Sequence, residues 1–177
     1  MKKNFFILAA MVCGSLAFYS CSKNSNENQG MSTVNVRLTD APTTYDEVNV
    51  DIRQVQVKFS DDSSNINGWV TLNTFPGIYR LLDLQNGVDT LLATGAFPFQ
   101  TVKEIRFVLG SNNTIKDAGV VYPLTVPSGS ESGLKLKISR DLNETLETIV
   151  IDFDAALSVT KDGTGDYKLR PVLRIKS

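Results

Sequence analysis

The sequence predicts an all-β domain, folded as an antiparallel β-sandwich or a barrel. Apolar and polar residues alternate with a period of two in one segment after another, which is typical of strands with one buried face. Clusters of Gly, Asn, Asp, Ser and Pro separate these segments at short intervals, as expected for strands joined by turns.

The first two strands alternate clearly. Their apolar residues are Val34, Val36 and Leu38 in the first strand, and Val48, Val50, Ile52, Val55, Val57 and Phe59 in the second. The phase of the second strand slips at Arg53 and Gln54, which are both polar. A slip of one residue would turn the rest of the buried face outward. We therefore expect a β-bulge near Arg53 and Gln54 that restores the burial of the residues after it.

The later strands follow the same pattern. Their alternating apolar residues are Ile105, Phe107 and Leu109; Leu134, Leu136 and Ile138; Ile149, Ile151 and Phe153; and Tyr167, Leu169, Leu173 and Ile175. Pro171 falls within the last segment and has no N–H to donate, so we expect this strand to lie at an edge or to be interrupted there.

Helical signals are weak. Asp141 and Glu144 have the spacing of a capping box, but only a short apolar pattern follows them, and residues 88–94 are ambiguous. Turn clusters occupy residues 61–68, 85–87, 110–113, 127–130 and 161–166. Residues 31–177 are therefore expected to form a single domain, because no internal repeat or second domain is evident.

The first twenty residues have the zones of an export signal. Lys2 and Lys3 precede an apolar run at residues 5–12, which is shorter than the roughly 20 residues that a membrane-spanning helix requires. Ser20 and Cys21 end the segment, and the sequence FYSC resembles the relaxed lipobox of Bacteroidetes-type lipoproteins. The resemblance implies a lipoprotein signal peptide at residues 1–20, cleavage before Cys21 and acylation of Cys21, with palmitate as the label that would report it. A plain secretory signal or an uncleaved anchor is the alternative, and Cys13 is a weaker acceptor because Val12 precedes it.

Residues 21–30 are polar and show no apolar periodicity, so they are expected to form a flexible tether. By analogy with lipoproteins, Ser22 in place of an aspartate favours the outer membrane of the cell envelope. The membrane, reached through Cys21, is thus the first expected partner. Which face of the outer membrane the domain occupies stays open.

Composition excludes several chemistries. The chain has 18 basic and 19 acidic residues, and removal of Lys2 and Lys3 with the signal would leave a formal charge of −3. This balance gives no support to nucleic-acid binding. Histidine is absent, and Cys21 would be the one cysteine left. An intrachain disulfide, a Cys/His zinc site and Ser-His-Asp or Cys-His catalysis are therefore excluded.

Several motifs resemble, in their order, domain-of-unknown-function family 4382, a lipoprotein domain of this bacterial type. They are LTDAP (38–42), YDEVNVDI (45–52), LLDLQNG (81–87), IRFVLGSNN (105–113), YPLTVPSGSESGLKL (122–136), IDFDAALSV (151–159) and YKLRPVLRI (167–175). The turn at residues 97–101 departs from the family pattern. The resemblance implies an immunoglobulin-like or transthyretin-like sandwich of about 8–10 strands, and it implies no activity or catalytic residues.

Four aspartates are candidate metal ligands. Asp152 and Asp154 are two apart on an expected strand and so share a face, and Asp40 and Asp46 flank the turn at residues 41–42. Carboxylates in this arrangement can bind calcium or act as an acid/base pair. The alternative is cross-strand pairing with Arg170 and Arg174, which we favour.

Other candidate sites are less specific. Residues 61–68 are rich in oxygen ligands but lack EF-hand spacing, and the small residues at 127–133 could cradle an anion or a sugar. Trp69, Tyr45 and Tyr79 could stack on a sugar ring, although a single tryptophan after a turn more often fills a core.

We expect a non-enzymatic binding or assembly module of the cell envelope, without a cofactor and with an envelope protein or polysaccharide as partner. A calcium-stabilised carbohydrate or polymer binder is the alternative. A carboxylate-based hydrolase is the third hypothesis, and it requires a cleft that holds two acids.

Overall fold

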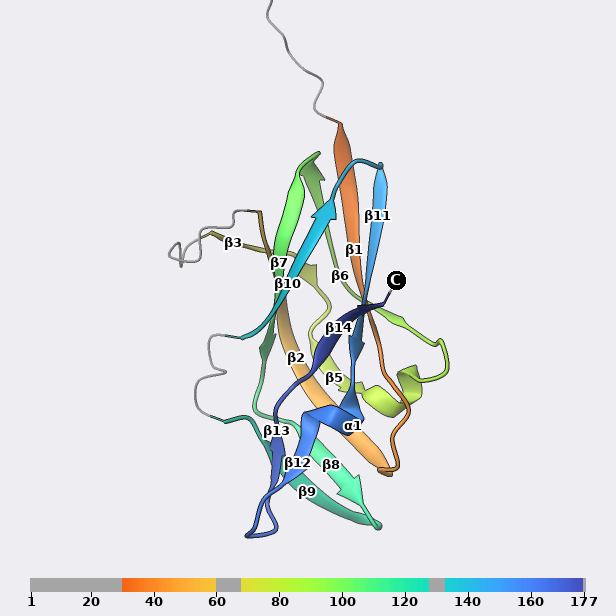
Figure 1. Ribbon diagram of the computed structural model, residues 1–177, viewed down its shortest axis with the longest axis vertical. Helices are drawn as coiled ribbons and strands as arrows, with labels where there is room; N and C mark the ends of the chain where they lie inside the picture. Colours follow the sequence, from red (N-terminus) through yellow and green to blue (C-terminus); the bar gives the residue numbers. More distant parts are fainter. Residues whose placement is uncertain (1–29, 60–67, 128–132, 177) are drawn as a thin grey trace, which may run out of the picture.

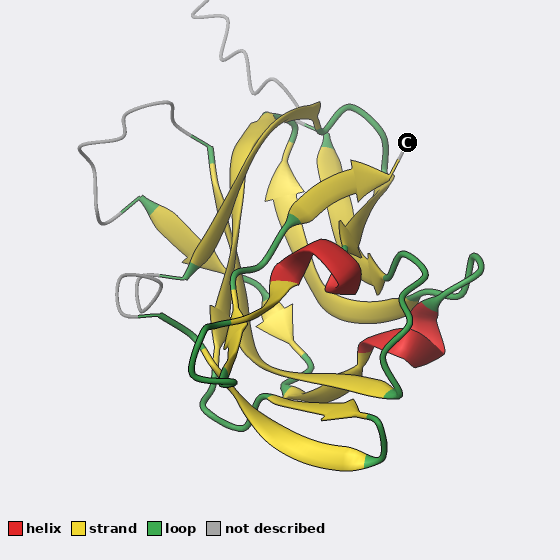
Figure 2. Cartoon of the chain, turned by 60° about the horizontal axis from the view of Figure 1, so that its bottom comes forward, coloured by secondary structure: helices red, strands yellow, loops and turns green. Residues whose placement is uncertain are grey.

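Two packed β-sheets form the domain. The computed structural model describes residues 30–59, 68–127 and 133–176 (Figure 1). The strands are β1 (Met31–Thr39), β2 (Glu47–Lys58), β3 (Trp69–Thr71), β4 (Asn73–Thr74), β5 (Gly77–Arg80), β6 (Thr90–Pro98), β7 (Thr101–Leu109), β8 (Thr114–Asp117), β9 (Val120–Thr125), β10 (Leu134–Asp141), β11 (Leu146–Phe153), β12 (Val159–Lys161), β13 (Tyr167–Leu169) and β14 (Leu173–Lys176). Figure 2 shows that strands dominate the described part of the chain, which holds two short helical segments, the 3₁₀ turn η1 (Leu81–Leu84) and α1 (Ala155–Ser158). The predicted all-β sandwich is therefore confirmed.

Both sheets are mixed, whereas the sequence predicted an antiparallel fold of 8–10 strands. The smaller sheet has the order β14-β11-β1-β6-β4, and the larger has the order β10-β7-β2-β8-β9-β13-β12, with β3 and β5 also paired to β2. Strand β1 pairs with β11 in parallel, as does β13 with β9. These parallel pairs join strands far apart in the sequence, so local alternation carries no information about them. The strands beyond the expected 8–10 are short, and they lie beside the long β2 or at the edges of the two sheets.

The core lies between the sheets, and the predicted alternation explains it. Val34, Val36 and Leu38 on β1 are fully buried, as are the inward-facing apolar residues of β2. The register of β2 against β7 shifts between Ile52 and Gln54, which leaves Arg53 and Gln54 exposed while Val55 returns to the core. The bulge expected at Arg53–Gln54 is confirmed.

The last predicted strand is split at Pro171. Strand β13 ends at Leu169 and belongs to the larger sheet, and β14 begins at Leu173 and pairs with β11 in the smaller sheet. The N–H of Val172 donates to Oγ of Ser158 (2.8 Å), and its carbonyl accepts from the N–H of Asp154 (3.0 Å). The expected interruption is confirmed. At this interruption the last segment passes from the larger sheet to the smaller one.

The capping box suggested at Asp141 and Glu144 is wrong. Strand β10 continues through Asp141, and the chain then turns directly into β11. Leu142 is buried, and its N–H donates to the carbonyl of Gln100 (2.8 Å), which fixes the turn in a non-helical conformation. The ambiguous residues 88–94 contribute the start of strand β6.

Candidate functional site

Three of the four candidate acids gather where β1 and β11 end and α1 begins. Asp40 follows β1 and is buried. Its Oδ1 accepts a hydrogen bond from the N–H of Ala155 (2.9 Å), and its Oδ2 accepts from Nε2 of Gln85 (3.0 Å). Burial raises the pKa of Asp40, the two hydrogen bonds oppose that rise, and the nearby charge of Asp152 adds to it.

Asp154 has a structural role at this junction. The strand ends at Phe153, so Asp154 is not on the strand beside Asp152 as expected, but forms the N-cap of α1. Its Oδ1 accepts from the N–H of Leu157 (3.0 Å), and its Oδ2 lies 3.3 Å from Nη1 of Arg174. A side-chain oxygen at this position satisfies a helix N–H that would otherwise lack a partner.

Asp152 lies on β11, opposite Thr39 on one side and Arg174 on the other. Its Oδ1 is buried and has no hydrogen-bond partner among the described residues. Burial raises the pKa of Asp152, the charge of Asp154 adds to the rise, and Arg174 and Lys176 oppose it. Of the two arginines predicted to pair across strands with these acids, Arg174 lies opposite Asp152 and forms its ion pair with Asp154. Arg170 lies between β13 and β14, outside both strands.

The fourth candidate lies elsewhere. Asp46 precedes β2, and its Oδ2 accepts from the N–H of Gly119 in the β8–β9 hairpin (2.8 Å). Within residues 30–59, 68–127 and 133–176, no group of three or more His, Cys, Asp or Glu side chains is arranged to hold a metal ion. The other loops predicted as ligand sites are residues 61–68 and 127–133. All but their end residues Gly68, Pro127 and Gly133 lie outside the described residues, as does Cys21.

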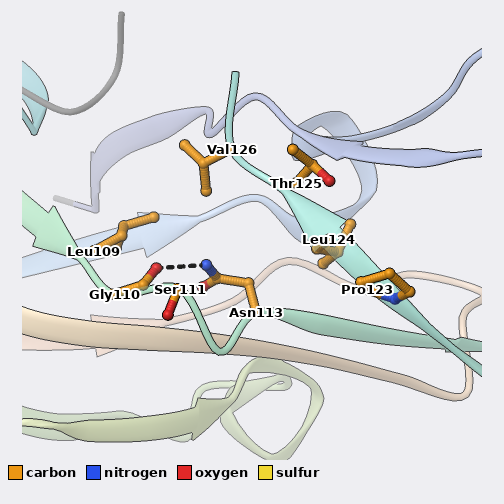
Figure 3. Close-up of a pocket in the computed structure, with 8 residues that line it drawn as sticks. All are labelled: Leu109, Gly110, Ser111, Asn113, Pro123, Leu124, Thr125 and Val126. Carbon is orange, nitrogen blue, oxygen red and sulfur yellow. Dashed lines mark hydrogen bonds between the residues drawn. The ribbon is translucent and has the colours of Figure 1, made fainter. Parts of the chain in front are cut away.

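An open pocket lies beside the loop between β7 and β8 (Figure 3). Its volume is about 450 Å³, and it is lined by Leu109, Gly110, Ser111, Asn113, Pro123, Leu124, Thr125 and Val126. Leucine, valine and proline side chains supply apolar walls, and the hydroxyls of Ser111 and Thr125 supply polar groups. This volume and this mixture are typical of sites for small ligands.

Asn113 holds the pocket loop in place. This buried side chain donates from Nδ2 to the carbonyl of Gly110 (2.8 Å), and its Oδ1 accepts from the N–H of Asp51 (2.8 Å). Its carbonyl accepts from the N–H of Leu124 (2.8 Å), which ties the loop to β9. The side chain and the carbonyl of this one residue therefore connect both walls of the pocket to β2.

Among the described residues, no charged side chain lines this pocket. Two further hollows in the described part are lined by residues 133–136 with 171–173, and by Arg140, residues 148–150, Ile175 and Lys176. None of the described residues that line the three hollows is an Asp or a Glu, so these residues do not form the paired-acid cleft that a glycoside hydrolase requires.

The comparison with protein families decides the membership of this chain. Residues 31–171 match the family described as a domain of unknown function (DUF4382). The chain belongs to the DUF4382 family. No curated protein and no solved structure matches the chain.

The DUF4382 domain places its single tryptophan on the outer face of the larger sheet, so the expected core position of Trp69 is wrong. Trp69 is half-buried and pairs with Lys58. The guanidinium carbon of Arg106 lies 4.4 Å from the centre of its ring, and the ammonium groups of Lys58 and Lys135 lie 5.9 and 6.0 Å away. Tyr45 and Tyr79 pack partly against the core. The Trp69 ring thus makes its cation–π contacts with side chains of the DUF4382 domain itself.

The pocket of the DUF4382 domain was not among the predicted sites. The sequence predicts a turn at its loop, residues 110–113, but the facing residues 123–126 form the end of β9 and the residue after it and contain no ligand-binding motif. Across the described part of the domain, no helix is long and apolar enough to cross a membrane.

Proposed function

We propose that this DUF4382 protein is a lipid-anchored cell-envelope protein of the outer membrane, and that its sandwich is a non-enzymatic binding module. The observation that carries the anchor is the position of Cys21, directly after a signal-like segment and nine residues before the first described residue, Gly30. Two or more acyl chains on one cysteine give stable membrane attachment, because each buried methylene contributes about 0.8 kcal/mol.

Metabolic labelling with palmitate tests the anchor. Cys21→Ser is expected to abolish incorporation, and Cys13→Ser, the matched control at the other cysteine of the chain, is expected to leave incorporation at the wild-type level. Equal labelling of Cys21→Ser and wild type would contradict the proposal.

The pocket between residues 109–113 and 123–126 is proposed as the binding site for a small uncharged ligand. Its described lining offers hydroxyl and carbonyl groups and no charged side chain. A charged ligand would therefore be buried there without a partner for its charge, which is unfavourable. A sugar ring has this combination of apolar faces and hydroxyl edges, which agrees with a polysaccharide partner.

Saturation-transfer NMR against neutral mono- and disaccharides tests the site. Val126→Trp fills the pocket and is expected to remove the transfer signals. Val121→Trp, on the exposed β8–β9 hairpin, is the matched control and is expected to retain them. Signals that survive Val126→Trp, or that are absent from the wild type, would contradict the assignment.

A further inference from the structure

Three exposed apolar side chains surround the point at which the described chain begins. Met31, Phe99 and Leu146 are 52%, 38% and 58% exposed. They come from the start of β1, the β6–β7 turn and the start of β11, and Figure 1 shows these three places at the same end of the sandwich. We call these residues the apolar tip.

Backbone pairing holds the tip together. The N–H of Phe99 donates to the carbonyl of Gly30 (2.8 Å), and the Phe99 ring lies so close to Gly30 that a Cβ there would be 2.4 Å from the ring. Met31 pairs with Pro98, and Leu146 pairs with Thr33 of the same strand. The tip is therefore built on the first residues of β1 and is fixed relative to the sandwich.

The chain before the tip is short. Eight residues lie between Cys21 and Gly30, and the nine steps along the chain, at no more than about 3.6 Å each, span at most about 32 Å in any conformation. An acyl group on Cys21 would keep the tip this close to the bilayer, and tethering raises the effective concentration of lipid at the tip. Shallow insertion of a few apolar side chains is then sufficient for docking.

The charges around the tip favour neutral headgroups. Asp141 ends β10 and Glu144 belongs to the β10–β11 connection, and Oδ1 of Asp141 accepts a hydrogen bond from Oγ1 of Thr101 (2.5 Å). Arg140 is paired with the buried Glu147 (2.9 Å). The described residues at this end therefore do not form the basic cluster that recognises anionic lipids.

We infer that the apolar tip docks on the surface of a zwitterionic lipid bilayer, an inference that rests on the proposed lipid anchor. Met31, Phe99 and Leu146 enter the boundary between headgroups and acyl chains. The β8–β9 hairpin, which Figure 1 shows at the opposite end of the longest axis, then points away from the membrane.

Tryptophan quenching in the full-length lipidated protein tests the inference. Phe99→Trp is compared with Val121→Trp, which places the same reporter on the distant hairpin at a position that is 62% exposed. The wild type, with Trp69 as its one tryptophan, supplies the signal to subtract. The probes are phosphatidylcholine vesicles with and without bromine on the acyl chains, and flotation measures attachment in the same samples.

We expect all three proteins to float, and the added fluorescence of Phe99→Trp to be shifted to the blue and quenched by bromine at least about twofold more than that of Val121→Trp, as for a ring buried about 5–10 Å deep. Leu146→Trp is the second reporter should Phe99→Trp not fold.

Equal quenching at both ends in proteins that float would overturn the docking and leave the anchor standing. A blue shift without bromine quenching would also overturn it, because the tip would then be covered by protein. Loss of flotation would overturn the anchor and the docking together.

Discussion

Gly110 sits at a position where a single methyl group has a predictable effect. It follows β7 and lines the pocket, and its N–H donates to the carbonyl of Asp51 (2.7 Å). A Cβ added at Gly110 would lie 2.2 Å from Oδ2 and 2.6 Å from Cγ of Asp51, and 2.6 Å from Nε of Arg53. Arg53 is exposed and can move, whereas the Asp51 side chain is fully buried.

The size of the effect follows from the interactions of Asp51 that the added methyl group would disrupt. Its Oδ2 is paired with Nη2 of Arg53 (2.8 Å) and accepts from the N–H of Asn112 (3.2 Å). Overpacking a buried site costs about 1–3 kcal/mol, and weakening hydrogen bonds to a charged group adds about 1.5–3 kcal/mol when they are lost. We expect Gly110→Ala to lower the free energy of unfolding by about 2–4 kcal/mol, which lowers Tm by roughly 5–15 °C in a domain of this size.

Urea unfolding followed by Trp69 fluorescence measures this free energy. Gly163→Ala is the matched control, because nothing lies within 4 Å of a Cβ at Gly163. It is expected to be neutral or to stabilise by up to about 1 kcal/mol through the unfolded state. A loss below about 0.5 kcal/mol for Gly110→Ala, similar to surface substitutions in general, would refute the reasoning.

A double-mutant cycle assigns the loss to Asp51. In an Asp51→Ala background the carboxylate that clashes is gone, so Gly110→Ala should destabilise less than it does in the wild type. Additive effects of the two substitutions would show that they do not interact, and the clash would then not be the cause.

Two further predictions concern the acidic junction. Asp154→Ala removes both the N-cap of α1 and the contact with Arg174, and we expect it to lower the free energy of unfolding by about 0.5–2 kcal/mol. Asp154→Asn keeps a capping oxygen and should recover most of this stability. Equal losses of stability in the two variants would contradict the capping role. Because burial raises the pKa of Asp40, the native state binds its proton more tightly than the unfolded state, and its contribution to stability is full below pH 3.8 and is lost as the pH rises through the native pKa. Asp40→Asn should remove this loss, so the stability of the variant relative to wild type should increase between pH 4 and 7 in urea titrations; a constant difference over that range would count against the raised pKa.

The sequence by itself determined the all-β fold class, the long alternating strands β1, β2, β7, β10 and β11, and the points where their pattern breaks. Its alternation does not predict β3 to β6, β8, β9 or β12. Alternation with period two is a local property, so the buried face of β1, the bulge at Arg53 and the interruption at Pro171 could be predicted without knowledge of the partners. The family membership also followed from ordered local motifs. The acids were identified as candidates because their residue type and spacing are visible in the chain.

Only the tertiary structure decided which strands pair and what each polar side chain contacts. The parallel pairing of β1 with β11 joins segments distant in sequence, whereas β13 and β14 are close in sequence and belong to different sheets. The pocket forms where residues 109–113, before the β8–β9 hairpin, face residues 123–126 at its end. Trp69 is half-buried, and three cations from β2, β7 and β10 lie close to its ring. Asp154 is a helix cap because its strand ends one residue earlier. Pairing and side-chain contacts depend on how whole faces fit together in space, and no local periodicity encodes that fit.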